Sequence, residues 1–235
     1  VRSLYTSGGL QEIMKIENEK AELLYSLGIN VNMAPVCDIT TNEKAFMYSR
    51  SLGQSPMITA IFSESVININ RQNNVGCVLK HFPGYGNNTD THTGIAIDNR
   101  SLDSLLACDL VPFQAGINFG CDAILVSHTI ITAIDDKNPA ALSEPLHRLL
   151  RENMGFGGVI VTDDLSMKAI TEKYGAEEAA VMAVMAGNDL LCCTDYAVQY
   201  SAVLNAVKSG QISVSSVRQS VLRILQWKDK LGILK

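Results

Sequence analysis

Four polar residues stand directly after short apolar runs and are the first candidates for chemistry: Asp38, His81, His128 and Asp163. In a barrel of parallel strands, all the carboxyl-terminal strand ends meet at one mouth, and that mouth holds the active site. Any one of these residues could instead cap the following helix or satisfy local backbone groups. Four such residues after four predicted strands favour a shared pocket.

The segment with the most chemical groups is residues 80–92, which read KHFPGYGNNTDTH. Its glycines permit unusual backbone angles and a close approach of a substrate. Asp90 and His92 are two residues apart, so both can lie on one side of an extended loop. A carboxylate that accepts from one imidazole nitrogen fixes the tautomer and leaves the other nitrogen for proton transfer. The alternative is a polar loop in which aspartate and histidine fall together by chance.

Two adjacent aspartates, Asp163 and Asp164, follow the apolar run 159–162. A carboxylate that leaves a buried strand is costly unless it is paired or used. Neighbouring side chains point in different directions, so we expect only one of the two to face the mouth. The sequence leaves open which one it is, and capping of the next helix is the alternative role.

The composition limits the classes of protein to which the chain can belong. It has 235 residues, 47% of them hydrophobic and 18% charged, with a formal net charge of −5. This length suits one large domain. The longest apolar run, near residues 179–187, is shorter than the roughly 18 residues that a membrane span needs. The negative charge argues against a general nucleic-acid binder and fits a small neutral ligand.

The six cysteines show no CxxC spacing, and most of them lie in apolar runs. We interpret them as reduced core residues rather than as disulfides or zinc ligands. We therefore expect no metal and no cofactor. No signal peptide is visible after Val1, which together with reduced cysteines favours a cytoplasmic protein. The sequence gives no prediction of the oligomeric state.

Strand-like and helix-like runs alternate along the chain. The expected strands are short and continuously apolar, which is typical of parallel strands buried on both faces, and they cover residues 29–38, 76–81, 123–128, 158–163 and 189–193. The expected helices between and around them cover residues 13–27, 57–73, 103–118, 176–186 and 213–231, and residues 139–154 are expected to form a loop followed by a helix. This order predicts an α/β fold, most simply a (β/α)8 barrel. A doubly wound open sheet is the alternative, although no G-x-G-x-x-G follows a strand.

Several segments resemble glycoside hydrolase family 3. The stretch KHFPGYGNNTDTH is similar to the family's K-H-F-P-G-H-G…D-x-H loop, and its D-x-H pair marks the β-N-acetylglucosaminidase branch. GFGGVIVTDDLSM resembles the strand that carries the family's nucleophile. Further likeness, in the family's order, is found in NVNMAPVCDI, SRSLG, PAALSEPLHRLLRENMGF and SVRQSVLRILQWKDKLGIL. The resemblance covers essentially the whole chain.

The resemblance implies that residues 1–235 form a single catalytic domain of the TIM-barrel type. It also implies that the first one or two strands of the barrel would precede Val1, so that the domain is incomplete at its start. The chain departs from the family loop at one further point, because Tyr85 stands where G-H-G has histidine. Since Asp90 and His92 are both present, we expect this change to alter the packing of the loop rather than its chemistry.

The resemblance also implies a role for each site residue. Asp163 would be the nucleophile, and His92 the general acid and base, oriented by Asp90. Four further residues would bind the sugar: Arg50, Lys80, His81 and Arg2. The implied activity is that of a retaining exo-β-N-acetylglucosaminidase that acts on small glycans or cell-wall fragments through a covalent glycosyl-enzyme intermediate. A histidine suits both proton transfers because its ordinary pKa, about 6.5, lies near neutrality.

Three other functions are compatible with the same residues. The chain could be a sugar-binding or regulatory relative without full activity. It could be a β-glycosidase or phosphorylase of the same family with another sugar preference. It could also be a different barrel enzyme in which Lys80 forms a Schiff base with a carbonyl substrate.

Overall fold

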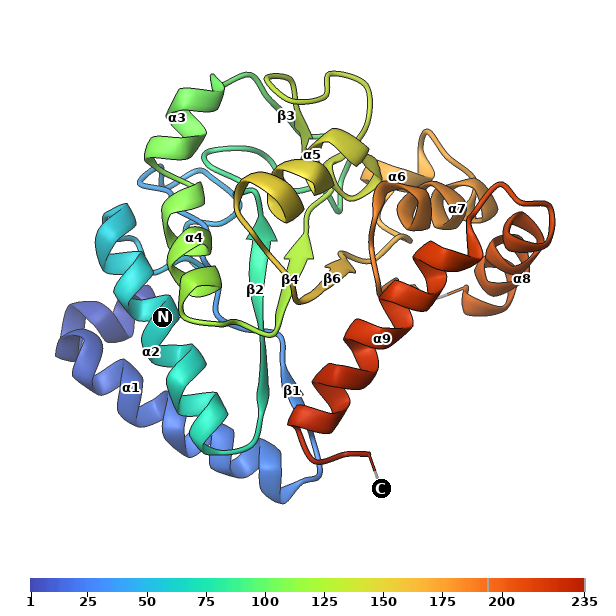
Figure 1. Cartoon of the computed structure of the whole chain (residues 1–235). Helices are drawn as coiled ribbons and strands as arrows, with labels where there is room; N and C mark the ends of the chain where they lie inside the picture. The colour runs from blue at the N-terminus through green and yellow to red at the C-terminus, as the bar shows by residue number, and fades with distance from the viewer. Residues whose placement is uncertain (194, 235) are drawn as a thin grey trace.

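The core of the molecule is a parallel sheet surrounded by helices (Figure 1). A computed structural model of the chain describes residues 1–193 and 195–234. The main sheet has the strand order β1-β2-β4-β6, with β1 at Val31–Asn32, β2 at Gly76–Phe82, β4 at Ala123–Val126 and β6 at Val159–Thr162. A second, two-stranded parallel sheet pairs β3 (Ile97–Asp98) with β5 (Ile130–Ile131).

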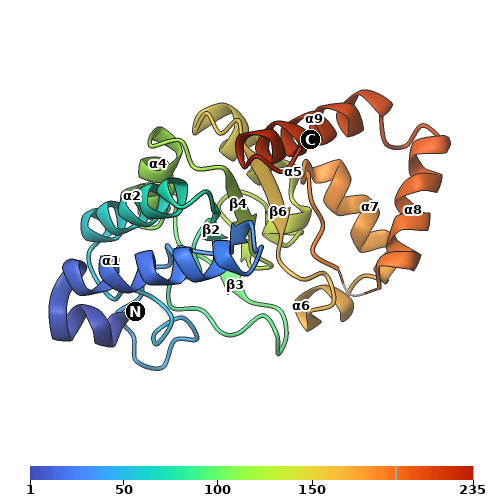
Figure 2. The same ribbon diagram turned by 90° about the horizontal axis from the view of Figure 1, so that it is seen from below.

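The helices flank this sheet. They are α1 (Arg2–Ser26), α2 (Pro56–Gln72), α3 (Leu102–Ala107), α4 (Leu110–Asn118), α5 (Glu144–Arg148), α6 (Lys168–Thr171), α7 (Ala176–Ala186), α8 (Tyr196–Lys208) and α9 (Val214–Lys230), with short turns η1 (Ala140–Leu142) and η2 (Leu149–Asn153). Figure 2 shows α1, α2 and α4 on one side of the molecule and α7, α8 and α9 on the other, with the main strands between them. No helix within the described residues is both long and apolar enough to cross a membrane.

The predicted α/β fold with buried parallel strands is confirmed. All residues of β4 and β6 are buried, and the two strands pair in register from Ala123 with Val159 to Val126 with Thr162. The strand order follows the chain order without a reversal, as in a barrel, whereas a doubly wound sheet reverses at its switch point. Over residues 1–193 and 195–234 the strands do not close into a complete ring.

Two of the predicted strands are much shorter than expected. In the segment 29–38 only β1 forms a ladder, followed by a single bridge from Val36 to Lys80. Pro35 interrupts this strand because it has no amide hydrogen to donate to a ladder. In the segment 189–193 the only pairing is a bridge from Leu190 to Val161. The Cys192 amide there donates to the side-chain hydroxyl of a β6 residue rather than to a backbone carbonyl.

The helix predictions also need correction. The run 103–118 is two helices, α3 and α4, because Pro112 has no amide hydrogen for the carbonyl of Cys108, four residues earlier, and its ring would clash with that carbonyl. The Asp109 side chain at the junction binds Arg100. Helix α8 was not predicted. Several of its side chains, such as Tyr196 and Tyr200, are exposed, so the apolar periodicity that marks a buried helix face is weak there. Three cysteines are buried, as expected for core residues, but Cys192 is exposed and two others are half-buried.

The largest apolar cluster lies between the sheet and the helices α1, α2 and α4. Phe82 at the end of β2 packs edge-on against Phe113 of α4, with ring centroids 5.2 Å apart and an interplanar angle of 88°. Phe62 and Ile67 of α2 belong to the same cluster. This packing fixes β2, the strand that leads into the 80–92 segment.

The C-terminal half of α9 lies across the amino-terminal ends of the strands. Trp227 packs so close to Gly76, the first residue of β2, that a Cβ atom there would be only 2.9 Å from the indole ring. Lys230 binds the carboxylate of Asp122, which directly precedes β4. Arg223 binds Asp189, which lies just before the Leu190 bridge. Because α9 covers the amino-terminal ends of the strands, we expect a ligand-binding site at their carboxyl-terminal ends.

Candidate active site

A buried carboxylate–imidazole pair stands at the carboxyl-terminal end of β2. Asp38 Oδ2 accepts from His81 Nδ1 at 2.8 Å and from the His81 amide at 3.1 Å. The side chains of His81 and Asp38 are only 4% and 0% exposed. Because a carboxylate accepts the Nδ1 hydrogen, His81 Nε2 becomes an acceptor. Arg50 Nη2 lies 3.4 Å from this nitrogen.

A second carboxylate–imidazole pair stands in the loop that follows β2. Asp90 Oδ1 accepts from His92 Nδ1 at 2.6 Å and from the His92 amide at 2.9 Å. Here the histidine side chain is 58% exposed and the aspartate 29%. The structure thus brings together the two residues whose spacing suggested a pair. The Nε2 atom of His92 is left for a ligand or water, which is the arrangement that proton transfer needs.

The two aspartates after β6 differ in their surroundings. Asp164 Oδ1 accepts from the Ser166 amide at 2.9 Å, and this bond forms the turn that leads toward α6. Asp163 Oδ1 accepts from the Asp164 amide at 2.9 Å. Across the described part of the chain, neither aspartate forms a hydrogen bond with its second carboxylate oxygen. What distinguishes them is their neighbours: the charge of Asp163 acts on Lys80 and on Tyr85, so Asp163 is the aspartate that lies toward the other candidate site residues.

Lys80 lies half-buried on β2, next to His81 in the chain. Burial, together with the positive charge of Arg50, lowers the pKa of its ammonium group, and the charges of Asp163 and Asp38 oppose this shift. The charges of Arg50, Asp163 and Asp38 therefore all act on Lys80, although these four groups come from separate segments of the chain.

His128 supports the turn that carries the aspartates. It follows β4, is fully buried, and its Nε2 donates to the backbone carbonyl of Asp164 at 2.9 Å. Burial lowers the pKa of His128, against the opposing charge of Asp163, and this favours the neutral ring. The position of His128 at a strand end was visible in the sequence, and the structure shows that it contacts the aspartate turn.

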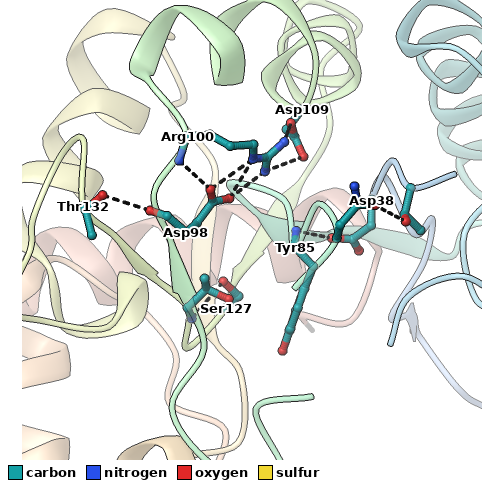
Figure 3. Close-up of polar contacts among 10 residues, drawn as sticks. Asp38, Tyr85, Asp98, Arg100, Asp109, Ser127 and Thr132 are labelled. Carbon is teal, nitrogen blue, oxygen red and sulfur yellow. Dashed lines mark hydrogen bonds and ion pairs between the residues drawn. The ribbon is translucent and has the colours of Figure 1, made fainter. Parts of the chain in front are cut away.

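An ion cluster beneath the loop was not predicted from the sequence. Figure 3 shows the Arg100 guanidinium between two carboxylates, 2.6 Å from both Asp98 and Asp109. Burial alone would lower the pKa of Arg100, but the hydrogen bonds and charges of Asp98 and Asp109 raise it. A Cβ atom at Gly84 would lie 2.6 Å from Asp109, and one at Gly86 would lie 2.5 Å from Arg100. Both glycines also have positive φ angles, so the loop can lie on this cluster only with glycine at these positions.

Arg2 interacts mainly with a neighbouring segment of the chain. Its guanidinium donates to the carbonyl oxygens of Thr40 and Tyr48 at 2.8 and 2.9 Å and to the Ser51 hydroxyl at 3.0 Å. It also stacks over the Tyr48 ring at 3.8 Å. These contacts attach α1 to the segment that carries Arg50. The structure does not place Arg2 against the histidines or aspartates described above.

The structure brings the other predicted site residues to one end of the sheet. Asp38, His81 and Lys80 come from neighbouring strand ends, and the charge of Asp163 acts on Lys80. No group of three or more His, Cys, Asp or Glu side chains within the described ranges is arranged to hold a metal ion. The carboxylates, imidazoles and ammonium group gathered at this end of the sheet are of the types that serve acid–base and nucleophilic chemistry on a polar ligand.

The family of the chain follows from comparison with known proteins. Residues 2–227 match the model of the glycosyl hydrolase family 3 N terminal domain. The chain belongs to glycoside hydrolase family 3.

Solved structures of this family superpose closely on the chain. The glycoside hydrolase family 3 β-N-acetylglucosaminidase from Paenibacillus sp. str. FPU-7 matches 99% of this chain and 46% of its own, with a TM-score of 0.94 and 33% identity. A family member from Mycobacterium smegmatis matches 100% of this chain and 72% of its own, with a TM-score of 0.90 and 31% identity. These matches confirm the predicted barrel-type class and the branch that the D-x-H pair indicated.

The chain is also similar to curated proteins that are named beta-hexosaminidases. Beta-hexosaminidase LpqI of Mycobacterium tuberculosis is 30% identical over 239 residues, which cover 97% of this chain and 61% of that protein. A beta-hexosaminidase of Xanthomonas campestris is 36% identical over 143 residues, 60% of this chain and 43% of its own. The chain therefore spans less than two thirds of the length of these relatives.

Proposed function

We propose that this chain is the catalytic domain of a retaining exo-β-N-acetylglucosaminidase, with residues 1–235 acting as one unit. The observation that carries the proposal is the Asp90–His92 pair, in which one imidazole nitrogen is held and the other is accessible. The names of the relatives support the sugar specificity. We further propose terminal β-linked N-acetylglucosamine on small glycans or cell-wall fragments as the substrate.

The first step of the reaction forms a covalent intermediate. The Asp163 carboxylate attacks the anomeric carbon, and the bond from that carbon to the leaving oxygen breaks. His92 Nε2 delivers its proton to the leaving oxygen, so the aglycone departs as a neutral alcohol. The contact between Asp90 and Nδ1 holds the ring in the correct orientation and stabilises its positive charge before the transfer.

The second step releases the sugar. The now neutral His92 takes a proton from water, and the resulting hydroxide attacks the anomeric carbon as the ester bond to Asp163 breaks. Two inversions give a product with the configuration of the substrate. Lys80, His81 and Arg50 bind the sugar hydroxyl groups, while Arg2 contributes by holding the segment that carries Arg50.

The test uses Asp163→Asn beside Asp164→Asn, a matched change one residue away. With an aryl β-N-acetylglucosaminide, Asp163→Asn should lose turnover by about 10⁴-fold or more, as expected when a nucleophile is removed. Mass spectrometry should detect a glycosyl adduct of a fluorinated substrate in the wild type and in Asp164→Asn but not in Asp163→Asn. Turnover by Asp163→Asn at the wild-type rate would refute the assignment.

The alternative functions give different results in the same assay. Binding of N-acetylglucosamine without turnover would indicate a sugar-binding relative. Formation of a sugar 1-phosphate in phosphate buffer would indicate a phosphorylase. Borohydride trapping of a carbonyl substrate that depends on Lys80 would indicate Schiff-base chemistry.

A further inference from the structure

Tyr85, which replaces the histidine of the family loop, is held firmly beside the buried pair. Its side chain is 1% exposed. Its amide donates to Asp38 Oδ1 at 2.8 Å, a contact visible in Figure 3. Its ring meets the His81 ring edge-on, with centroids 5.3 Å apart and an interplanar angle of 87°. Backbone and ring are therefore both fixed relative to the Asp38–His81 pair.

The hydroxyl of Tyr85 connects this fixed region to the open pair. It is hydrogen-bonded to the hydroxyl of Thr91, which lies between Asp90 and His92 in the chain. Thr91 is 0% exposed, although the histidine next to it is exposed. The carbonyl oxygen of Thr91 also accepts from the Ala169 amide at 3.2 Å. Thr91 is thus the buried anchor between the two residues of the open pair.

A second contact runs through Phe46. Its ring centroid lies 5.8 Å from that of Tyr85 and 5.9 Å from that of His92. The Arg50 guanidinium lies over the same ring at 5.2 Å. The exposed imidazole therefore rests on a ring that Tyr85 also contacts, so displacement of Tyr85 would disturb both sides of the pair.

We propose that Tyr85 is a positioning residue that holds the Asp90–His92 pair, through Thr91 and Phe46, at a fixed place relative to Asp38 and His81. This inference rests on the proposed function, because it assigns His92 the proton transfers. Tyr85 transfers no proton itself. Burial, together with the charges of Asp163, Asp38 and Asp90, raises the pKa of the phenol, although the Thr91 hydrogen bond works in the opposite direction. The phenol therefore stays protonated near neutral pH.

The kinetic test removes single hydroxyl groups. Tyr85→Phe keeps the ring and deletes the contact to Thr91, and Thr91→Val deletes it from the other side. The quantity to compare is kcat/KM, which reports the first step alone. For a substrate with an alkyl leaving group, which needs protonation, kcat/KM should fall about 3- to 10-fold in each variant, as expected for one hydrogen bond. The kcat/KM of a dinitrophenyl substrate, whose leaving group needs no proton, should be nearly unaffected. The double variant should lose no more than either single variant.

The control is Tyr174→Phe, which deletes another buried tyrosine hydroxyl, one bonded to Asn138 and not to the open pair. It should leave the ratio of the two substrates unchanged. Hydrogen exchange of residues 86–95, measured without substrate, should be faster in Tyr85→Phe and unchanged in Tyr174→Phe.

The outcomes separate the two proposals. A wild-type chain that turns over no glycoside would refute the proposed function, and the hydrogen-exchange comparison would then decide whether Tyr85 anchors the loop. An active wild type in which Tyr85→Phe leaves both the substrate ratio and the exchange unchanged would refute the role of Tyr85 alone. A loss of kcat/KM that is equal for both substrates would likewise overturn it, because a general structural defect acts on both.

Discussion

The two carboxylate–imidazole pairs of this molecule have nearly the same geometry and opposite surroundings. In both, an aspartate oxygen accepts from Nδ1 and from the backbone amide of the same histidine. His81 and Asp38 are almost completely buried, whereas His92 and Asp90 are partly open to solvent. The first pair joins residues 43 apart in the chain and the second joins residues 2 apart.

This difference shows how one motif can serve two purposes. The buried pair ties two strand ends together and depends on the rest of the fold. The open pair forms within one loop, so it can face a ligand without being part of the core. This contrast fits the proposed roles, which are structural support and sugar binding for the first pair and proton transfer for the second.

Removal of the open imidazole should have the largest effect among changes to these two pairs. In His92→Ala, kcat/KM for substrates with alkyl leaving groups should fall by about 10²- to 10⁴-fold, because general acid catalysis is lost. A dinitrophenyl substrate should lose much less in its first step, since its leaving group needs no proton. Steady-state and burst kinetics on the two substrates measure this difference. Equal losses on both substrates would argue against proton transfer by His92.

Disruption of the buried pair should instead lower stability. Asp38→Asn replaces a carboxylate oxygen that accepts hydrogens by an amide group that donates them, against the Nδ1 hydrogen of His81. The free energy of unfolding should fall by about 1–3 kcal/mol, as when a buried polar group loses its partner. Denaturant unfolding measures this change. Asp90→Asn is the matched control and should unfold within about 0.5 kcal/mol of the wild type, because surface changes usually cost little.

The mildest perturbation is a change of pH, which should alter stability without any substitution. Burial lowers the pKa of His128 and of His147, so both histidines bind protons less well in the folded than in the unfolded chain. As the pH falls below about 6.5 the unfolded chain gains these protons first, and each histidine should then cost up to about 1.4 kcal/mol per pH unit. Unfolding in urea between pH 7 and pH 5 should show this loss, reduced in His147→Gln. A flat profile would contradict the burial of neutral histidines.

The parts of the fold that the sequence predicts well are those set by local apolar runs. The strands β2, β4 and β6 and the helices α2, α7 and α9 have such runs, and each lies where the sequence places it. The Asp90–His92 contact was also foreseeable, since only two residues separate the partners. The break between α3 and α4 was foreseeable too, because Pro112 cannot continue a helix across Cys108. The ion pair of Asp109 with Arg100 at this break was not foreseeable.

The features of the candidate site that could not be predicted from the sequence depend on contacts between residues far apart in the chain. The role of Asp38 became visible only with His81 and the Tyr85 amide beside it. The choice between Asp163 and Asp164 depended on which carboxylate lies near Lys80 and Tyr85. In the Gly84-Tyr85-Gly86 segment the sequence shows two glycines, but not the Arg100 cluster that lies against them.

The contacts of α9 determine when the sheet can complete its packing during synthesis of the nascent chain. Lys230 and Asp122 are 108 residues apart, and at a synthesis rate of roughly 5–20 residues per second they are made several seconds apart. Until Trp227 and Lys230 have been synthesised, Gly76 and Asp122 lack their contacts with α9 at the amino-terminal ends of the strands. The strands and loops that carry the candidate site are therefore synthesised before α9, which covers the opposite end of the sheet. The sheet reaches its final packing only after α9 has been synthesised.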